Sequence, residues 1–223
     1  CSVLLLRVRR PPQATLASSR AASDVYKRPA LTFHYLCTHI ETMDPISLIN
    51  KYYADNEPLR ELLLLHSRQV TQRALDIARR HPELPIDCEF VEQAAMLHDI
   101  GIFLTDAPGI HCHGTQPYLL HGRLGAELMR QEGLERVARV CERHTGTGLT
   151  PEVIARQNLP LPPGDYRPET LEEQLICYAD KFFSKSHPER VRSIADTARS
   201  LEKFGAEGVA VFLGWAKLFD NYT

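Results

Sequence analysis

The stretch that decides the fold is AAMLHDIGI, residues 94–102, in which an apolar run ends at the dipeptide His98-Asp99. Imidazole and carboxylate groups are the ligands that divalent transition metals accept from a protein when no thiolate is available. A single His-Asp pair is weak evidence, because chance supplies one in many chains. Other groups of the same kind lie on both sides of the pair, namely His66, His121, His144 and Asp180. The ordered series predicts a metal site assembled from several segments.

Apolar residues recur at close to helical spacing through most of the chain after residue 43. Asp44 followed by Pro45 predicts the first helix start, because Asp caps free amides and proline fits the first helical turn. Capping boxes at Thr170 and Ser186 predict two further starts. Residues 105–117 and 159–168 are expected to be loops, and no run shows strand alternation. We therefore expect an all-α fold, with further helices over residues 58–80, 89–99, 118–131, 134–144, 151–157, 171–184, 187–204 and 207–219.

Length and composition fit one domain with an appendage. The 223 residues, 43% of them hydrophobic, can bury one sizeable core, which we place at residues 43–223. Residues 1–42 are basic and lack apolar periodicity, so we expect a disordered or non-native appendage, an organelle transit peptide being the alternative. The six cysteines form no CxxC pair, which indicates reduced thiols in a cytoplasmic protein. The formal net charge of −2 gives no reason to expect nucleic acid or a membrane as partner.

The order of the six residues resembles a known family. His66, His98-Asp99 and Asp180 resemble the H…HD…D signature of the HD superfamily of metal-dependent phosphohydrolases, over about residues 44–220. His121 and His144 resemble the two extra histidines of its two-metal members. The resemblance implies a helical bundle with the metal site in an interior pocket. It also implies one ion on His66, His98, Asp99 and Asp180 and a second on Asp99, His121 and His144, whereas one-metal members need only the first four.

The resemblance also implies an activity, the hydrolysis of a phosphate ester or anhydride by a metal-activated water. The motifs HG…GAE, HTGTG and YADK resemble bacterial HD proteins that split diadenosine tetraphosphate, so we expect a nucleotide or dinucleoside polyphosphate as a small-molecule substrate. Ile102-Phe103 departs from that group, which often has lysine there. Nitrogen and oxygen ligands suit Fe, Mn, Co or Ni. Two alternatives stay open: a di-iron oxygenase of the same superfamily, and a non-catalytic nucleotide-binding regulator.

Each candidate residue also has a simpler interpretation. His144 ends an expected helix, where a cationic imidazole would interact favourably with the helix dipole. Asp180 lies in the apolar run LICYADKFF, and we do not expect Lys181 to be its main partner, because adjacent helical side chains face different directions. For catalysis we select Asp99, Arg143 and Lys181. Further phosphate-binding candidates are Lys185 and Arg123, and the loop residues His111 and His113 are expected at the substrate entrance rather than on the metal.

Overall fold

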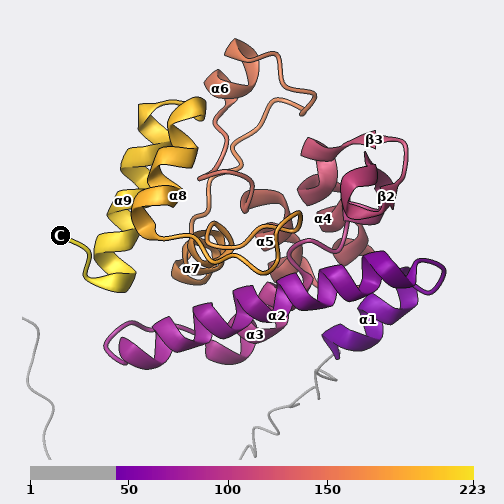
Figure 1. Ribbon diagram of the computed structural model, residues 1–223, viewed down its shortest axis with the longest axis horizontal. Helices are drawn as coiled ribbons and strands as arrows, with labels where there is room; N and C mark the ends of the chain where they lie inside the picture. Colours follow the sequence, from indigo (N-terminus) through magenta and orange to yellow (C-terminus); the bar gives the residue numbers. More distant parts are fainter. Residues whose placement is uncertain (1–43) are drawn as a thin grey trace, which may run out of the picture. The chain divides into compact units, whose positions relative to one another are not determined.

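The computed structural model describes residues 44–223, and the expected appendage at residues 1–42 lies outside the described residues. The all-α prediction is confirmed, since helices make up most of this part of the chain (Figure 1). None of the helices within residues 44–223 is long and apolar enough to cross a membrane. The α-helices are α1 (Pro45–Tyr52), α2 (Glu57–Arg80), α3 (Cys88–Leu97), α4 (His121–Gln131), α5 (Glu135–Arg143), α6 (Pro151–Arg156), α7 (Leu171–Asp180), α8 (Ile194–Leu201) and α9 (Ala206–Asp220).

Local capping explains where most of these helices begin. The Asp44 side chain accepts hydrogen bonds from two amides of the first turn of α1, and Pro45 occupies the first helical position. Thr170 begins α7 with a complete capping box. The predicted start at Ser186 is wrong, because α8 begins eight residues later and is capped by Ser193. The intervening segment instead folds back along the end of α7, where the Arg192 amide donates to the Phe182 carbonyl at 2.9 Å.

Residues 105–117 form a small sheet rather than the expected irregular loop. Strand β1 (Thr105–Ala107) pairs antiparallel with β2 (Cys112–His113) and parallel with β3 (Gln116–Pro117), in the order β2-β1-β3. Short 3-10 turns, η1 (Ile102–Leu104), η2 (Pro108–Ile110) and η3 (Tyr118–Leu120), connect the strands to one another and to the helices on either side. Strands of two or three residues are too short to show alternation of apolar and polar residues, so the sequence carries no pattern that indicates them.

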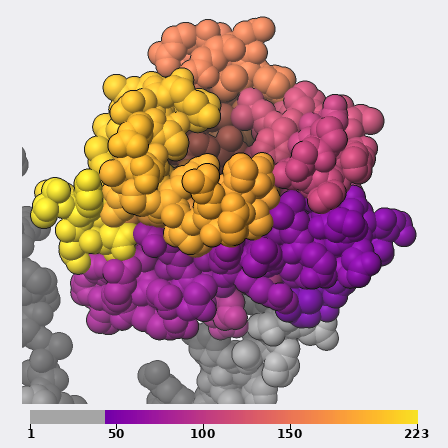
Figure 2. Space-filling model, viewed as in Figure 1, coloured from indigo at the N-terminus to yellow at the C-terminus, as the bar shows by residue number. Residues whose placement is uncertain are grey.

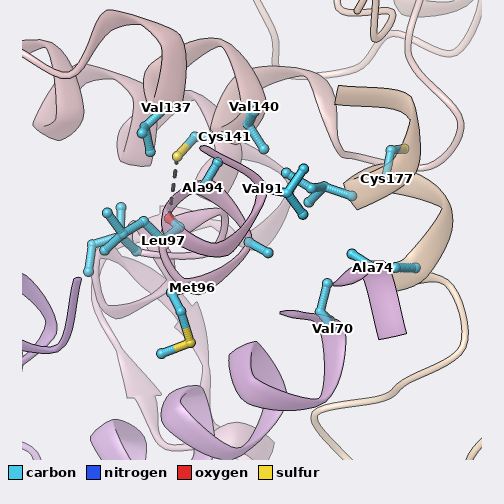
Figure 3. Close-up of a cluster of buried hydrophobic side chains, with 14 of the residues drawn as sticks. Val70, Ala74, Val91, Ala94, Met96, Leu97, Val137, Val140, Cys141 and Cys177 are labelled. Carbon is cyan, nitrogen blue, oxygen red and sulfur yellow. Dashed lines mark hydrogen bonds between the residues drawn. The ribbon is translucent and has the colours of Figure 1, made fainter. Parts of the chain in front are cut away.

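The core lies where α3 packs against α2, α5 and α7. Figure 3 shows this cluster, with small and branched side chains of α3 facing those of α2 and α5. The buried thiol of Cys141 donates to the Leu97 carbonyl at 3.4 Å and thereby ties α5 to the end of α3. Cys141 and Cys177 are buried, whereas Cys88, the first residue of α3, is exposed. Because α3 is enclosed, its last turn ends inside the protein, and His98-Asp99 follow directly.

Two glycines let neighbouring segments approach this turn closely. A Cβ atom on Gly101 would lie 2.4 Å from both the Gly125 nitrogen and the His121 carbonyl oxygen, which are backbone atoms of α4. A Cβ atom on Gly122 would lie 2.4 Å from the Cys141 carbonyl oxygen of α5. Contacts this short leave no room for a side chain, so the turn after Asp99, the start of α4 and the end of α5 are held together backbone against backbone.

We expect Gly101→Ala to lower the free energy of unfolding by about 1–3 kcal/mol or more, because backbone atoms cannot yield as a flexible side chain can. Urea denaturation followed by circular dichroism measures the change. Gly214→Ala is the matched control. It lies inside α9 with open space around its Cβ position and should stabilise the protein by about 0.5–1 kcal/mol. Equal stability of the two variants would contradict the close packing at Gly101.

Candidate metal centre

The structure brings the six side chains singled out in the sequence into one place. His66 lies in the middle of α2, His98 and Asp99 in the turn after α3, His121 at the start of α4, His144 just after α5 and Asp180 at the end of α7. Five of them are buried, and the Asp180 side chain is 13% exposed. Their ligand atoms form two groups, each within 4.8 Å, namely His66, His98, Asp99 and Asp180, and Asp99, His121 and His144.

The two oxygens of Asp99 are divided between the groups. Asp99 Oδ2 lies 3.2 Å from His66 Nε2 and 2.9 Å from His98 Nε2. Asp180 Oδ1 completes this group, 3.1 Å from His66 Nε2. On the other side, Asp99 Oδ1 lies 3.4 Å from the Nε2 atoms of both His121 and His144. Asp99 is therefore the one residue that the two groups share.

The backbone fixes the orientation of three of these imidazole rings. Nδ1 of His98, His121 and His144 lies 2.6–2.7 Å from the carbonyl oxygen three residues earlier in each case. A carbonyl oxygen only accepts hydrogen bonds, so each Nδ1 carries a hydrogen and each Nε2 points into the cluster. A ligand histidine whose other nitrogen donates to a carbonyl is typical of protein metal sites.

The second group consists of acceptors that face one another. Burial lowers the pKa of His121 to about 3 and also lowers that of His144, so both rings are neutral and both Nε2 atoms carry lone pairs. These two atoms lie 3.0 Å apart and cannot hydrogen-bond to each other with their hydrogens on Nδ1. Asp99 Oδ1 faces the same point and has no hydrogen-bond partner. A cation at this point would satisfy all three lone pairs together, and the residues therefore fit a divalent metal ion.

The charges of the first group (His66, His98, Asp99 and Asp180) strongly affect one another. Burial opposes ionisation of Asp99, but the Lys185 ammonium and the His98 imidazole hold the pKa of this carboxyl well below its usual range. Burial likewise opposes protonation of His98, yet the Asp99 and Asp180 carboxylates raise its pKa to about 9. Asp99 Oδ1 and the Nε2 atoms of His66 and His98 have no hydrogen-bond partner. The two carboxylates thus favour positive charge at this point, which a bound cation would supply in place of the His98 proton.

Two lysines of the segment after α7 reach the cluster. Lys185 Nζ lies 2.5 Å from Asp99 Oδ2. Lys181 Nζ lies 2.6 Å from Asp180 Oδ2 and donates to the His144 carbonyl at 3.0 Å. The expectation that Lys181 would not be the main partner of Asp180 is wrong, because α7 ends at Asp180 and the long side chain of Lys181, the C-cap residue, turns back to the carboxylate. Of the two, Lys185 is the one that touches the shared carboxylate, although it was not among the residues selected for catalysis.

The structure places the other predicted residues away from the cluster. Arg143 does not line the cavity at the site and instead pairs with Glu169 at 2.6 Å and with the Arg167 carbonyl at 2.8 Å. Arg143 is the last residue of α5. Arg123 pairs with Glu127 on the surface of α4. His111 and His113 are exposed and line neither the cluster nor the cavity.

A cavity of about 1080 Å³ opens from the cluster to the surface. His121, His144 and Asp180 line its floor, and Figure 2 shows the hollow between α6, the α8–α9 pair and the segment that contains the small sheet. Tyr118, which sequence analysis did not single out, lines the wall and stacks on His121 with ring centroids 4.7 Å apart. Burial raises the pKa of Tyr118 to about 12, so its hydroxyl keeps its proton and can donate. Its position three residues before a predicted ligand was the available clue.

Comparisons with known proteins agree with this arrangement. A tRNA (cytidine(56)-2'-O)-methyltransferase of Thermoplasma volcanium is 32% identical over 166 residues, which cover 74% of this chain and 42% of that protein. A methyltransferase of the same name from Picrophilus torridus is 32% identical over 142 residues, 63% of this chain and 37% of that protein. An uncharacterized protein of Methanocaldococcus jannaschii is 37% identical over 123 residues, 54% of this chain and 65% of that protein.

The chain thus spans less than two thirds of the length of each of these relatives. No solved structure matches it. The model of the HD domain family matches residues 63–184, a range that contains all six residues of the cluster and more than half of the chain. The chain therefore belongs to the HD domain family.

Proposed function

We propose that this protein is a metal-dependent phosphohydrolase that cleaves a phosphate ester or anhydride in a small molecule, with a nucleotide or dinucleoside polyphosphate as substrate. The observation that carries the proposal is the division of Asp99 between two groups of unsatisfied acceptors at the floor of a cavity. We propose one divalent ion, Fe, Mn, Co or Ni, for each group. Bound ions of this kind supply water activation and positive charge against a phosphoryl group.

The residues around the cluster suit a phosphoryl group. Lys185 and Lys181 bring two ammonium groups to the edge of the cluster, where they can neutralise phosphoryl oxygens at the cavity floor. The Tyr118 hydroxyl is a further donor on the wall beside His121. The helices hold the six cluster residues in place, so their acceptor atoms need little reorganisation during the reaction. The substrate thus meets positive charge and donors that are already in position.

We do not extend methyl transfer to this chain. That activity is in the names of two relatives, and the chain spans 42% and 37% of them. The converging imidazole and carboxylate groups instead suit a cation-assisted hydrolysis. We also propose that nucleic acid is not the substrate, because the whole chain carries a formal net charge of −2.

Metal analysis of the purified protein followed by a hydrolysis screen tests the proposal. The screen should cover mononucleotides, nucleoside polyphosphates and dinucleoside polyphosphates with Mn, Fe, Co and Ni in turn. Release of phosphate or of a nucleotide that requires metal and stops on chelation supports the proposal. Consumption of O₂ with an organic substrate by the iron-loaded protein, with no phosphate released, would instead favour an oxygenase.

We expect Asp99→Ala to remove metal and activity together, because both groups lose their shared carboxylate. Turnover should fall by more than about 100-fold, since even the loss of a partner outside the ligand set can cost that much. The far-ultraviolet circular dichroism spectrum should stay helical. Asp76→Ala, an exposed aspartate of α2 outside the cluster, is the control. Turnover of Asp99→Ala at the wild-type rate would refute the assignment.

The number of ions is tested at the second group. His121→Ala and His144→Ala should each lower bound metal from about two equivalents towards one and reduce turnover steeply. Metal content measured on folded protein, with the exposed His187→Ala as control, decides the matter. If His144 merely stabilises the end of its helix, its replacement should cost about 0.3–1 kcal/mol of stability and leave the metal content unchanged.

Replacement of Lys185 by methionine, which is uncharged and of similar length, tests whether its ammonium binds the phosphoryl group. Lys185→Met keeps the apolar stem but removes the ammonium that lies 2.5 Å from Asp99. We expect kcat/KM to fall on the order of 100-fold, as for the loss of one preorganised donor. Inhibition by inorganic phosphate should also weaken. Lys217→Met, on the exposed side of α9, should behave as wild type. An unchanged phosphate inhibition constant in Lys185→Met would show that Lys185 does not contact the phosphoryl group.

A further inference from the structure

The cavity has basic residues at its mouth as well as at its floor. Arg156, Arg192 and Lys203 line it, and all three are exposed. The cluster residues His121 and His144 line the same cavity and are buried. The difference in exposure separates the two sets of residues along the depth of the cavity, with the cluster below and the three cations at the opening.

The three cations at the mouth differ from the other basic residues of the cavity in having no acidic partner. Lys181 and Lys185 are paired with carboxylates of the cluster, and Arg167 is paired with Asp165. Among residues 44–223, by contrast, no ion pair joins a carboxylate to any of the three cations at the mouth. The Arg192 guanidinium donates to the Lys181 carbonyl at 3.5 Å, and the Lys203 ammonium lies over the ring of Phe204. Their charge is therefore available to a ligand.

The three cations come from different sides of the opening. Arg156 ends α6, Arg192 precedes α8, and Lys203 belongs to the 3-10 turn η4 (Glu202–Phe204) between α8 and α9. These three elements border the hollow in Figure 2. Of the described residues that line the cavity, only Asp180 at the floor and Glu207 carry carboxylates. The mouth thus has a net positive charge, which favours an anionic group there.

Apolar side chains line the space along with these charges. Leu149, Val153, Phe183, Leu201 and Phe204 all contribute to the wall. The volume of about 1080 Å³ is at the upper end of what small-molecule sites occupy, and far more than one phosphoryl group needs. The cavity therefore offers charge at two depths and apolar surface for the organic part of a ligand.

We propose that Arg156, Arg192 and Lys203 form a second phosphate subsite at the mouth of the cavity. This inference rests on the proposed function for the floor of the cavity. It narrows the substrate class to phosphorylated molecules with two separated phosphate groups, one bound at the cluster and the other at the mouth. Arginine suits the outer position because its planar guanidinium binds phosphate oxygens in pairs.

Calorimetric titration of the metal-loaded protein with two matched nucleotides tests this subsite by affinity rather than by turnover. Adenosine 5′-monophosphate and adenosine 3′,5′-bisphosphate differ by one phosphate group. At about 0.15 M salt, where distant charges are screened, the wild type should bind the bisphosphate on the order of 10-fold more tightly than the monophosphate. The triple variant Arg156→Gln, Arg192→Gln, Lys203→Gln should lose this preference and bind the monophosphate as before.

The control variant removes three positive charges from positions outside this cavity. The triple variant Arg68→Gln, Arg79→Gln, Lys217→Gln changes residues that do not line this cavity, and it should keep the preference. Equal affinity of the wild type for both nucleotides, no measurable binding of the bisphosphate, or an equal loss in both triple variants would overturn the subsite. A preference for the bisphosphate without any hydrolytic activity would preserve the subsite and refute the proposed function.

Discussion

The rest of the structure depends on one constraint, which is that the ionised carboxylate of Asp99 lies entirely inside the protein. Asp99 has no exposed surface, its Oδ1 atom has no hydrogen-bond partner, and its Oδ2 atom faces the Lys185 ammonium. An isolated charge in such a place is very costly, so the surrounding structure must supply compensation. Imidazole rings from α2, α4, α5 and the end of α3 surround the carboxylate, and Lys185 approaches it from the segment after α7. The arrangement of the helices follows from the need to bring these groups to one point.

Backbone geometry makes this convergence possible. Three rings are oriented by carbonyl oxygens of their own chain segment, each three residues earlier, so that no separate side chain is required to aim them. Gly101 and Gly122 then allow the segments that carry the ligands to touch through their backbones. Orientation and spacing are thus both set by main-chain atoms, which have less freedom to shift than side chains do.

The sequence predicted the six cluster residues well and the segments around the cluster less well. His98-Asp99 and its four partners could be found because ligand chemistry restricts residue type and because periodic helices carry each one. Other features could not be found from the sequence, because they depend on how a non-helical segment folds back on the bundle. These are the ion pair of Lys181, the position of Arg143 and the start of α8. The capping pattern at Ser186 is local, whereas the segment around it is held by distant contacts such as that of Gln69 with the Pro188 carbonyl. Short-range patterns carry no information about such contacts.

The cavity is built from two kinds of backbone, helices at its floor and connecting segments at its mouth, and the two can evolve at different rates. Its floor is formed by side chains at helix positions that the core fixes, whereas much of its mouth belongs to short turns and to the segments on either side of α6 and before α8. Insertions and substitutions in those segments disturb few buried contacts, whereas a change at the floor disturbs the whole bundle. The selectivity of the pocket can therefore drift over generations while the cluster at its floor is inherited intact.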